Sequence, residues 1–287
     1  MWDAALIAIK TTNYAATLGA AGAALFLGYG KALLESGDRL RIRRIILALA
    51  LASVIASVAQ IVVSAGSLSG DAAGMVDGSI LSMVWQAGAI RCNSIRAAGL
   101  LLMALGVSSD RASWLAYVGA VMAATSFAWI GHAASLRPEV LPVVSLSVHL
   151  AAVAFWTGAL LPLLVVSRSG DLSRTAATAA RFGSLALLIV GGLIAAGLVL
   201  LSMLLGGVTK LWSSAYGGVM TVKLGLVACL LCVAAFNKLR LTPRLLAGDA
   251  SALGALRTSI RFELLVAGFI FAATATLTTT AGPPALV

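Results

Sequence analysis

Two histidines, His132 and His149, are the only imidazole side chains in the 287 residues, and both occur in one stretch, GHAASLRPEVLPVVSLSVHLAAVAFWTG (131–158). Neutral imidazole is the commonest metal ligand in proteins, and a pair of histidines also serves as axial ligands of haem iron. A single histidine near a helix end would more often bond a loop carbonyl. Two in one stretch favour ligation of a metal ion or a haem over a structural role.

Residues that could complete a site recur near the histidines at helical spacing. Side chains three, four or seven positions apart lie on one face of a helix. Two such sets occur: Met122, Thr125, Trp129 and His132 before the turn, and His149 with Trp156 after it. Gly158 follows Trp156 and allows another helix to approach closely. We therefore expect the two helices to present these faces to one site, with Trp129 and Trp156 supporting it.

Methionines offer a second kind of ligand. Thioether and imidazole groups together suit Cu(I), whereas magnesium or calcium would require carboxylates. Each methionine taken alone is more often a packing residue. Four lie in the outer halves of the apolar runs, where a site near the histidines could use them: Met83, Met122, Met203 and Met220. We assign Met122, Met203 and Met220 to the candidate metal site.

The composition sets the framework that must position these residues. Hydrophobic residues make up 61% of the chain and charged residues 10%, and the mean hydropathy is +1.04. A membrane span needs about 20 mostly apolar residues. We predict an all-α polytopic membrane protein whose single transmembrane domain, 1–287, is a bundle of eight helices, the first retained rather than cleaved. The predicted spans are 5–29, 45–67, 79–107, 112–134, 143–166, 182–206, 216–236 and 262–281.

The basic residues predict the topology. The net charge is +10, but the basic residues lie between apolar runs, so binding to nucleic acid is not expected. With the N-terminus outside, Arg137 and Lys210 are the only basic residues in outer loops. Since cytoplasmic loops are rich in Lys and Arg, both termini are expected on the outer side of the membrane. The cytoplasmic loops or helix ends then hold fourteen of the twenty basic residues: Lys31, Arg39, Arg41, Arg43, Arg44, Arg111, Arg168, Arg174, Arg181, Lys238, Arg240, Arg244, Arg257 and Arg261.

Four basic residues fall inside the predicted spans. Lys10 is expected to extend outward along its own stem. For Lys223, the same outward position and an inward role both stay open. Arg91 and Arg96 either line a polar cavity, or the third helix begins later, near residue 92, after an interfacial segment at 76–90.

Cysteine and carboxylate side chains argue against other kinds of site. Cys92, Cys229 and Cys232 all fall inside spans, so a disulfide framework is not expected. The last two have CxxC spacing, but among Leu, Val and Ala they are interpreted as buried packing residues. Glu263 is the only carboxylate placed inside a span, near its cytoplasmic end, which gives little support to transport of a hard metal ion.

Three stretches resemble the copper resistance protein D (CopD/PcoD) family of inner-membrane proteins. GHAAS followed by VHLAAVAFWTGALLPL (148–163) is similar to a turn and helix of that family. RFGSLALLIVGGLIAAGLVLLSMLLGGVTKLWSSAYGGVMTVKLGLVACLLCVAAFNKLRLTPRL (181–245) resembles its C-terminal core, and WQAGAIRCNSIR (85–96) is loosely similar. The resemblance covers most of 79–281, is strongest over 181–281, and leaves the first two helices uninformative.

The resemblance implies a copper-related membrane protein that works with a periplasmic CopC-like copper-binding protein. The residues that match the family's motifs are His132, His149, Trp156, Tyr216, Gly217, Lys223 and Asn237. Because no soluble copper-binding domain and no His-rich or Met-rich N-terminal tract is recognised in the sequence, primary capture of periplasmic copper is expected to be either delegated to another protein or absent.

Three functions stay open at this point. The favoured one is import of copper from the periplasm through a His/Met site, without enzymatic activity. The alternative is a b-type haem protein with His132 and His149 as axial ligands for electron transfer, in which Lys223 and Arg91 hold the propionates. A third is a structural anchor for a periplasmic chaperone.

Overall fold

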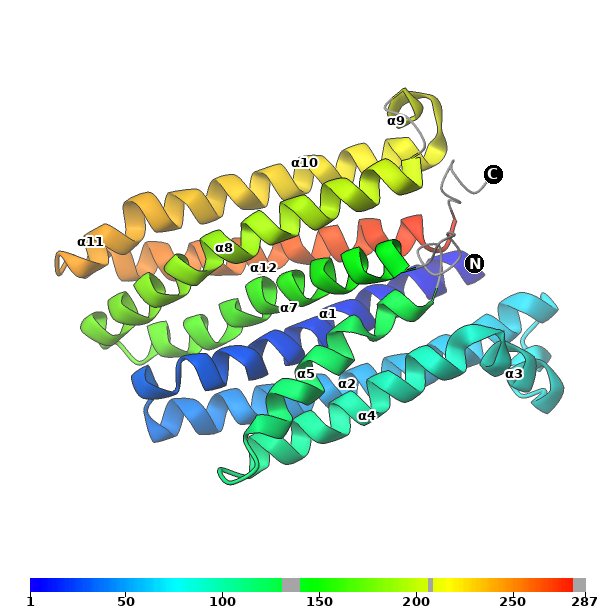
Figure 1. The fold of residues 1–287 in the computed structure, drawn as a ribbon, viewed down its shortest axis with the longest axis horizontal. Coiled ribbons are helices and arrows are strands. Elements are labelled where there is room, and N and C mark those ends of the chain that lie inside the picture. Colours follow the sequence, from blue (N-terminus) through cyan, green and yellow to red (C-terminus); the bar gives the residue numbers. More distant parts are fainter. Residues whose placement is uncertain (131–139, 206–208, 281–287) are drawn as a thin grey trace.

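In a computed structural model, the chain is described over residues 1–130, 140–205 and 209–280. It is 90% helical, and no strand occurs in these ranges. The long helices lie side by side along one axis of the molecule, and the short helices α3, α9 and α11 lie at its ends (Figure 1). The all-α membrane architecture predicted from the composition is confirmed.

The helices of the two halves can be given in chain order. The first half contains α1 (Trp2–Tyr29), α2 (Ser36–Ser69), α3 (Gly78–Val84), α4 (Ile90–Ser108) and α5 (Trp114–Thr125), which a 3-10 turn (Ser126–Trp129) extends. The second half contains α7 (Val140–Arg168), α8 (Leu172–Leu205), α9 (Lys210–Ser213), α10 (Ala215–Phe236), α11 (Thr242–Leu246) and α12 (Ser251–Leu277). Two π-helical turns, Trp85–Ala89 and Asn237–Leu241, join α3 to α4 and α10 to α11.

Six helices in the described ranges are long and apolar enough to cross a membrane: α2, α4, α7, α8, α10 together with α11, and α12. The other two predicted spans, 5–29 and 112–134, correspond to α1 and α5. The apolar segment that begins with α5, Trp114–Trp129, is shorter than a full span. The eight-span count therefore stays a prediction.

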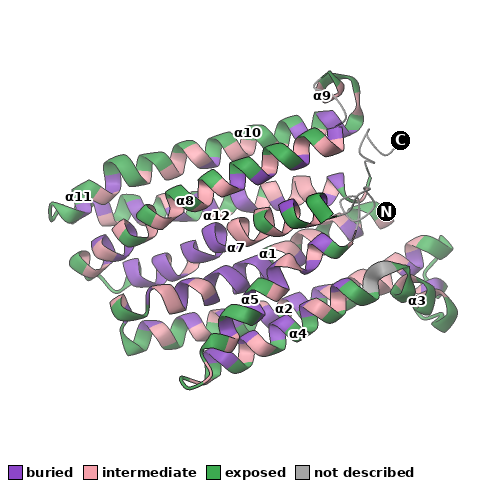
Figure 2. Ribbon diagram, in the orientation of Figure 1, coloured by how far each residue is buried: buried purple, intermediate pink, exposed green. Residues whose placement is uncertain are grey.

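α1 is not among the six apolar helices of membrane length found in the described ranges, and its main contacts are with other helices. It lies in the middle of the bundle against α2, α5, α7 and α12, and much of its length is buried (Figures 1 and 2). At its crossing with α7, a Cβ on Gly158 would lie 2.5 Å from the Cα of Gly22 and 2.7 Å from the nitrogen of Ala23. Gly158 does permit a close approach, as predicted, and the helix that approaches is α1.

The third predicted span, 79–107, is divided in the structure. α3 and a π-helical turn precede α4, and the membrane-length helix begins at Ile90. Of the two alternatives for this run, a helix that starts near residue 92 is close to the observed start of α4. Arg91 is exposed in the first turn of α4, whereas Arg96 is only 3% exposed. The two arginines therefore do not share one environment.

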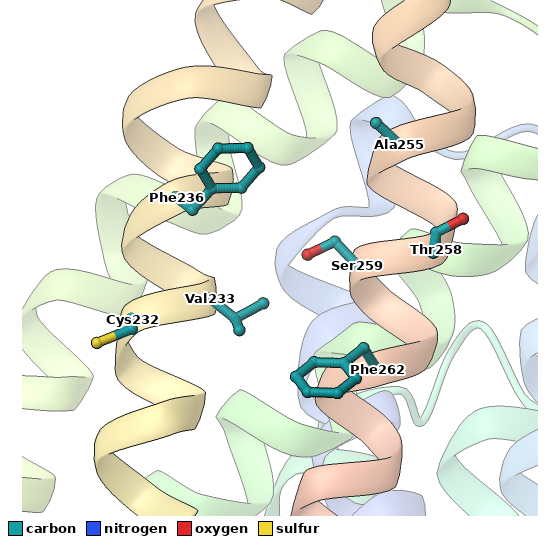
Figure 3. A pocket seen from close by; sticks show the side chains of 7 residues that line it. All are labelled: Cys232, Val233, Phe236, Ala255, Thr258, Ser259 and Phe262. Carbon is teal, nitrogen blue, oxygen red and sulfur yellow. The ribbon is translucent and has the colours of Figure 1, made fainter.

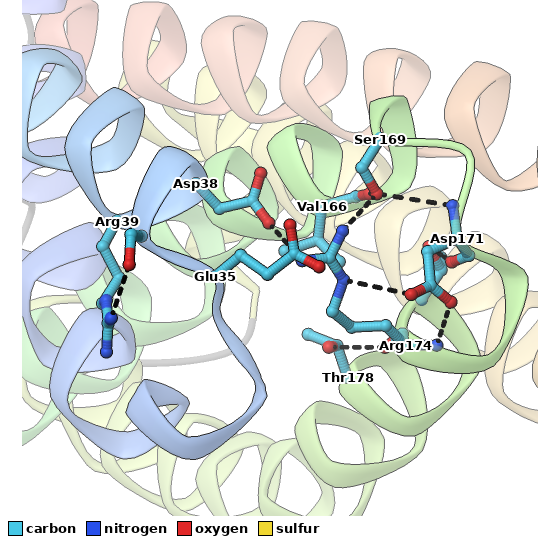
Figure 4. Close-up of polar contacts among 10 residues, drawn as sticks. Glu35, Asp38, Arg39, Val166, Ser169, Asp171, Arg174 and Thr178 are labelled. Atoms are coloured by element: carbon cyan, nitrogen blue, oxygen red, sulfur yellow. Dashed lines mark hydrogen bonds and ion pairs between the residues drawn. The ribbon is translucent and has the colours of Figure 1, made fainter.

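One end of the bundle holds an ion-pair cluster that ties α2 to α8. The Arg174 guanidinium lies 2.8 Å from Oε1 of Glu35 and 3.0 Å from Oδ2 of Asp38, with Asp171 on its other side at 3.6 Å (Figure 4). The side chain of Asp38 is only 5% exposed. The loop between α1 and α2 and the loop between α7 and α8 therefore meet at this end.

Two further contacts place other loops at the same end. Arg43 lies 2.9 Å from Oδ1 of Asp110, which brings in the α4–α5 loop. Arg257 donates from Nε to the main-chain oxygen of Ser167 at 3.0 Å, which brings in the first turns of α12. We call this the basic end, because loops with many of the predicted cytoplasmic arginines meet there.

The opposite end, which we call the terminal end, holds the start of α1 and the end of α12. Lys10 donates from Nζ to the main-chain oxygen of Thr278 and to Oγ1 of Thr279, both at 2.9 Å. The outward extension of Lys10 along its own stem stays a prediction. Its ammonium binds a carbonyl at the C-terminus of α12, where the helix dipole favours a cation.

Candidate functional site

His149 lies on α7 with its ring against α8. A Cβ on Gly197 would lie 3.5 Å from both Cε1 and Nδ1 of the imidazole, so this face of α8 leaves room for the ring. The ring also approaches the main chain of Leu193, and the ammonium of Lys223 on α10 acts on it electrostatically. Lys223 is partly buried, and the choice between its outward position and an inward role stays a prediction.

Nδ1 of His149 is buried and has no hydrogen-bond partner within the described residues. Most buried polar atoms in folded proteins are satisfied, so an unpaired one calls for an explanation. A neutral imidazole with a free nitrogen is a competent metal ligand. The structure thus leaves this nitrogen available for a ligand.

His132 falls in 131–139, outside the described residues, so its pairing with His149 stays a prediction. Trp129, at the end of the 3-10 turn that follows α5, is exposed. The guanidinium of Arg91 lies 5.9 Å from the centroid of its ring, within the range of a cation–π contact. Arg91 and Trp129 therefore face each other where α4 and α5 meet.

The candidate methionines come from four helices. Met122 on α5 faces α4. A Cβ built on Gly99 of α4 would lie 3.0 Å from the Cβ of Met122. Met220 on α10 is buried, Met203 on α8 is partly exposed, and Met83 on α3 is exposed. Met122 and Met220 thus pack against different neighbours.

Two apolar clusters flank the layer of His149 and Lys223. We call them the end cluster, which lies toward the terminal end, and the middle cluster. Along α10, Met220 precedes Lys223 and Leu230 follows it. Along α7, His149 precedes Trp156. On the antiparallel α8, the order along the chain is Leu193, then Gly197 beside the His149 ring, then Leu205. The end cluster contains Leu205, Tyr216, Met220 and Leu277, and the middle cluster contains Trp156, Leu193, Leu230 and Val266. His149 and Trp156 share a face of α7, as predicted, but they occupy successive layers.

A second polar layer lies beyond the middle cluster, toward the basic end. Glu263 on α12 is 2% exposed, and its Oε1 accepts a hydrogen bond from Nδ2 of Asn237 at 2.5 Å. Oδ1 of Asn237 and Oγ of Ser259 are buried and have no partner in the described ranges. Glu263 was noted from the sequence only as a lone carboxylate, and Asn237 only as a matched position.

The four layers form what we call the column, between α7, α8, α10 and α12. From the terminal end, it consists of the end cluster, the His149 layer, the middle cluster and the Glu263 layer. Polar groups with unpaired atoms alternate with apolar barriers. Chemically, such an arrangement can hold an ion at two separate levels and keep water from connecting them.

A buried polar network that sequence reasoning missed lies in the first half. The guanidinium of Arg96 donates to Oγ of Ser126 and of Ser57, both at 3.1 Å, to Oδ1 of Asn93 at 3.3 Å and to Sγ of Cys92 at 2.8 Å. We call this group and its partners on α1 and α2 the Arg96 network. It joins α4 to α2 and to the turn after α5.

The Arg96 network continues through α1 and α2. Asn13 donates to Ser57 at 3.2 Å and accepts from Thr17 at 3.1 Å and from Ser53 at 3.2 Å. The hydroxyls of Thr17 and Ser53 are 2.6 Å apart. A signal was present, because Asn13 and Thr17, like Ser53 and Ser57, are four positions apart in otherwise apolar helices. The first two helices were therefore more informative than expected.

A groove of about 640 Å³ lies between α10 and α12 on the outer face of the bundle (Figure 3). It is lined by Cys232, Val233, Phe236, Ala255, Thr258, Ser259 and Phe262. Cys229 and Cys232 are exposed, so their interpretation as buried packing residues was wrong. Within the described residues, no group of three or more His, Cys, Asp or Glu side chains could hold a metal ion.

Two family models match the chain. Residues 176–277 match the model described as copper resistance protein D, and residues 1–137 match copper resistance protein D-like, N-terminal domain. His132 lies inside the second match, whereas His149 and Trp156 lie between the two. No curated protein and no solved structure matches the chain. The two matched segments cover most of the chain, which therefore belongs to the copper resistance protein D family.

Proposed function

We propose that this copper-handling membrane protein imports copper ions from the periplasm, through the column between α7, α8, α10 and α12. Membership of the copper resistance family supports copper as the cargo. The observation that carries the proposal is the buried, unpaired Nδ1 of His149, whose ring lies against Gly197 of α8.

We further propose eight spans with both termini in the periplasm. α1 and α5 would be the two spans that hydropathy alone does not select. Loops with many basic residues meet at one end, and the start of α1 and the end of α12 lie at the other. Since positive loops stay in the cytoplasm, the His149 layer would lie in the outer half of the membrane.

The ligand set that we propose is His149 and His132 with methionine help from Met122, Met203 and Met220. Met220 is the best placed of the three in the structure, because it lies one helical turn from Lys223 on the same face of α10. Imidazole and thioether groups suit Cu(I). Exchange between them lets the ion move without losing all its ligands at once.

Lys223 gives the His149 layer a feature that a transport site requires. Its ammonium opposes a cation at Nδ1 and so weakens binding at this level. An ion that is transported must bind well enough to enter and weakly enough to leave. Lys223 would therefore tune the release of copper, while Trp156 and Tyr216 close the apolar layers on either side.

Delivery is proposed to come from a periplasmic CopC-like copper-binding protein that docks at the terminal end. Trp129 is near the end of the described range 1–130, just before the segment that contains His132. Arg91 lies over the ring of Trp129, and both side chains are exposed. They would contribute to the docking surface or guide the ion toward His132. The protein would then act as a carrier of copper and not as an enzyme.

Measurement of copper accumulation in cells that express His149→Ala tests the proposal. Copper-dependent accumulation should fall to the level of cells without the protein, while Ser145→Ala, one turn away on α7, should match the unaltered protein. Unchanged accumulation in His149→Ala would exclude the proposed route. An absorption spectrum of the purified protein tests the haem alternative, because a Soret band that disappears in His149→Ala would replace copper import with haem ligation.

A further inference from the structure

The Glu263 layer contains more hydrogen-bonding capacity than its neighbours satisfy. Glu263 receives one hydrogen bond, from Nδ2 of Asn237, while Oδ1 of the same amide remains buried without a partner. Ser259 lies one turn before Glu263 on α12, and its hydroxyl is also buried and unpaired. Asn237 begins a π-helical turn, a deviation from α-helix that often accompanies function.

The basic residues near this layer are engaged elsewhere or exposed. Lys238 donates to the main-chain oxygen of Gly183 on α8, and Arg257 donates to that of Ser167 on α7. Arg240 and Arg261 are exposed. In the part of the chain that the structure describes, Glu263 has no ion pair, and an ionised carboxylate in a span without a cation is costly.

The chemistry of the amide explains why a proton would satisfy this layer. An ionised carboxylate only accepts hydrogen bonds, and so does Oδ1 of Asn237. A carboxylic acid can donate its O–H to the amide oxygen while its other oxygen accepts from the amide N–H. The observed bond from Nδ2 to Oε1 is one half of this pair, and the unpaired Oδ1 is the free acceptor of the other half.

Asp38 shows what a buried ionised carboxylate looks like in the same protein. Its side chain is 5% exposed, and its Oδ2 lies 3.0 Å from the guanidinium of Arg174 (Figure 4). Burial of the two acids is similar, and the difference lies in their partners, a cation for Asp38 and an amide for Glu263.

We propose that Glu263 and Asn237 form a proton-exchange site on the copper path. This rests on the proposed function. With the layer empty, the Glu263 carboxyl holds a proton. When Cu(I) arrives from the His149 layer, the O–H bond breaks, the proton leaves toward the basic end and the carboxylate balances the charge of the ion. When the ion leaves, the carboxylate takes up a proton again, and no oxidation or reduction occurs.

Infrared difference spectroscopy of the full-length protein in lipid nanodiscs tests the resting state. At neutral pH without copper, we expect the carbonyl band of one protonated carboxyl, shifted in D₂O and absent from Glu263→Gln. The variant should fold, because glutamine has the same shape and can keep the amide contact. Asp38→Asn, the matched control with an altered ion-paired acid, should keep the band. A wild-type protein without this band would overturn the proposal.

Addition of Cu(I) under anaerobic conditions tests the exchange. The band should lose most of its intensity as copper loads, and should stay unchanged in His149→Ala because copper no longer reaches the column. A band that persists in the wild type while copper is bound would overturn the exchange.

Copper binding and transport separate the two proposals. Glu263→Gln should bind Cu(I) within about twofold of the wild-type affinity but accumulate at least about fivefold less copper in cells. Accumulation equal to wild type would overturn the role of Glu263. If instead His149→Ala left accumulation unchanged while the resting band was present, the proposed import route would fail and the protonated acid would stand.

Discussion

The Arg96 network and the column each bury polar side chains within a membrane-embedded bundle, yet they differ in how these are satisfied. In the Arg96 network, the guanidinium reaches four acceptors and the hydroxyls and amide of α1 and α2 bond one another. In the column, Nδ1 of His149, Oδ1 of Asn237 and Oγ of Ser259 have no partner among the described residues.

This difference separates polar groups that hold helices together from polar groups that are free to bind. A saturated network contributes to stability because every donor lost leaves an acceptor unpaired in a low-dielectric region. An unpaired buried atom has no hydrogen bond that could contribute to stability. The free-energy cost of removing it from water is offset when a ligand bonds to it. Substitutions in the Arg96 network should therefore change stability, and substitutions in the column should change copper binding or copper transport.

The largest effect is expected for Arg96→Ala. It removes four hydrogen bonds and leaves a cavity between α2, α4 and the turn after α5, which should cost roughly 3 kcal/mol of stability. Thermal unfolding in detergent measures this, with Arg91→Ala, an exposed arginine in the same helix, as the control that should change little. Copper affinity of the folded fraction should be retained. Equal melting temperatures for the two variants would remove the distinction between the regions.

His149→Ala should show the opposite pattern. Loss of the proposed copper ligand is expected to lower Cu(I) affinity by about 100-fold, which corresponds to about 2.7 kcal/mol. The melting temperature of the metal-free protein should fall less than in Arg96→Ala, because Nδ1 has no hydrogen bond to lose and the ring gives up only its contact with the main chain of Leu193. Competition with a chromogenic Cu(I) chelator measures the affinity. A destabilised variant with wild-type affinity would place His149 among the structural polar residues.

Lys223→Met tests the charge beside the imidazole. Removing the ammonium should raise Cu(I) affinity by about tenfold, or about 1.4 kcal/mol, and slow the release of copper. Lys223→Arg keeps the charge and should leave the affinity near that of the wild type. The same competition assay applies, and an affinity that does not respond to the loss of charge would contradict the electrostatic contact.

The smallest effects distinguish two serines. Ser53→Ala breaks contacts with Asn13 and Thr17 and should cost about 1 kcal/mol. Ser259→Ala removes a hydroxyl without a partner and should change stability by less than about 0.5 kcal/mol. Thermal unfolding of the two variants side by side provides the comparison, and a larger loss for Ser259→Ala would show that its hydroxyl has a structural bond.

Local sequence patterns predicted the helices better than the contacts between them. Each of the eight apolar runs overlaps a helix, because hydrophobicity over about 20 residues is a property of the chain itself. The prediction was less accurate at α3 and α4, where a π-helical turn divides the run. Cys229 and Cys232 were predicted to be buried and are exposed, because burial depends on which helix lies beside them.

The candidate site was predicted in part. Helical spacing alone correctly placed His149 and Trp156 on one face of α7, while the union of Met122, Met203 and Met220 in one site stays a prediction. The pairing of Asn237 with Glu263 could not be predicted, because these residues lie on different helices whose relative rotation is set by packing along their whole length.

The sequence by itself determined a helical membrane protein with asymmetrically placed charge and only two histidines, since composition and spacing act locally. Only the tertiary structure decided which buried polar atoms are satisfied. That outcome depends on distances of about 3 Å between side chains from different helices, and packing of the whole bundle fixes those distances. Arg96 and His149 look equally out of place in an apolar chain, and only their neighbours show that each guanidinium nitrogen of Arg96 is hydrogen-bonded while Nδ1 of His149 has no partner among the described residues.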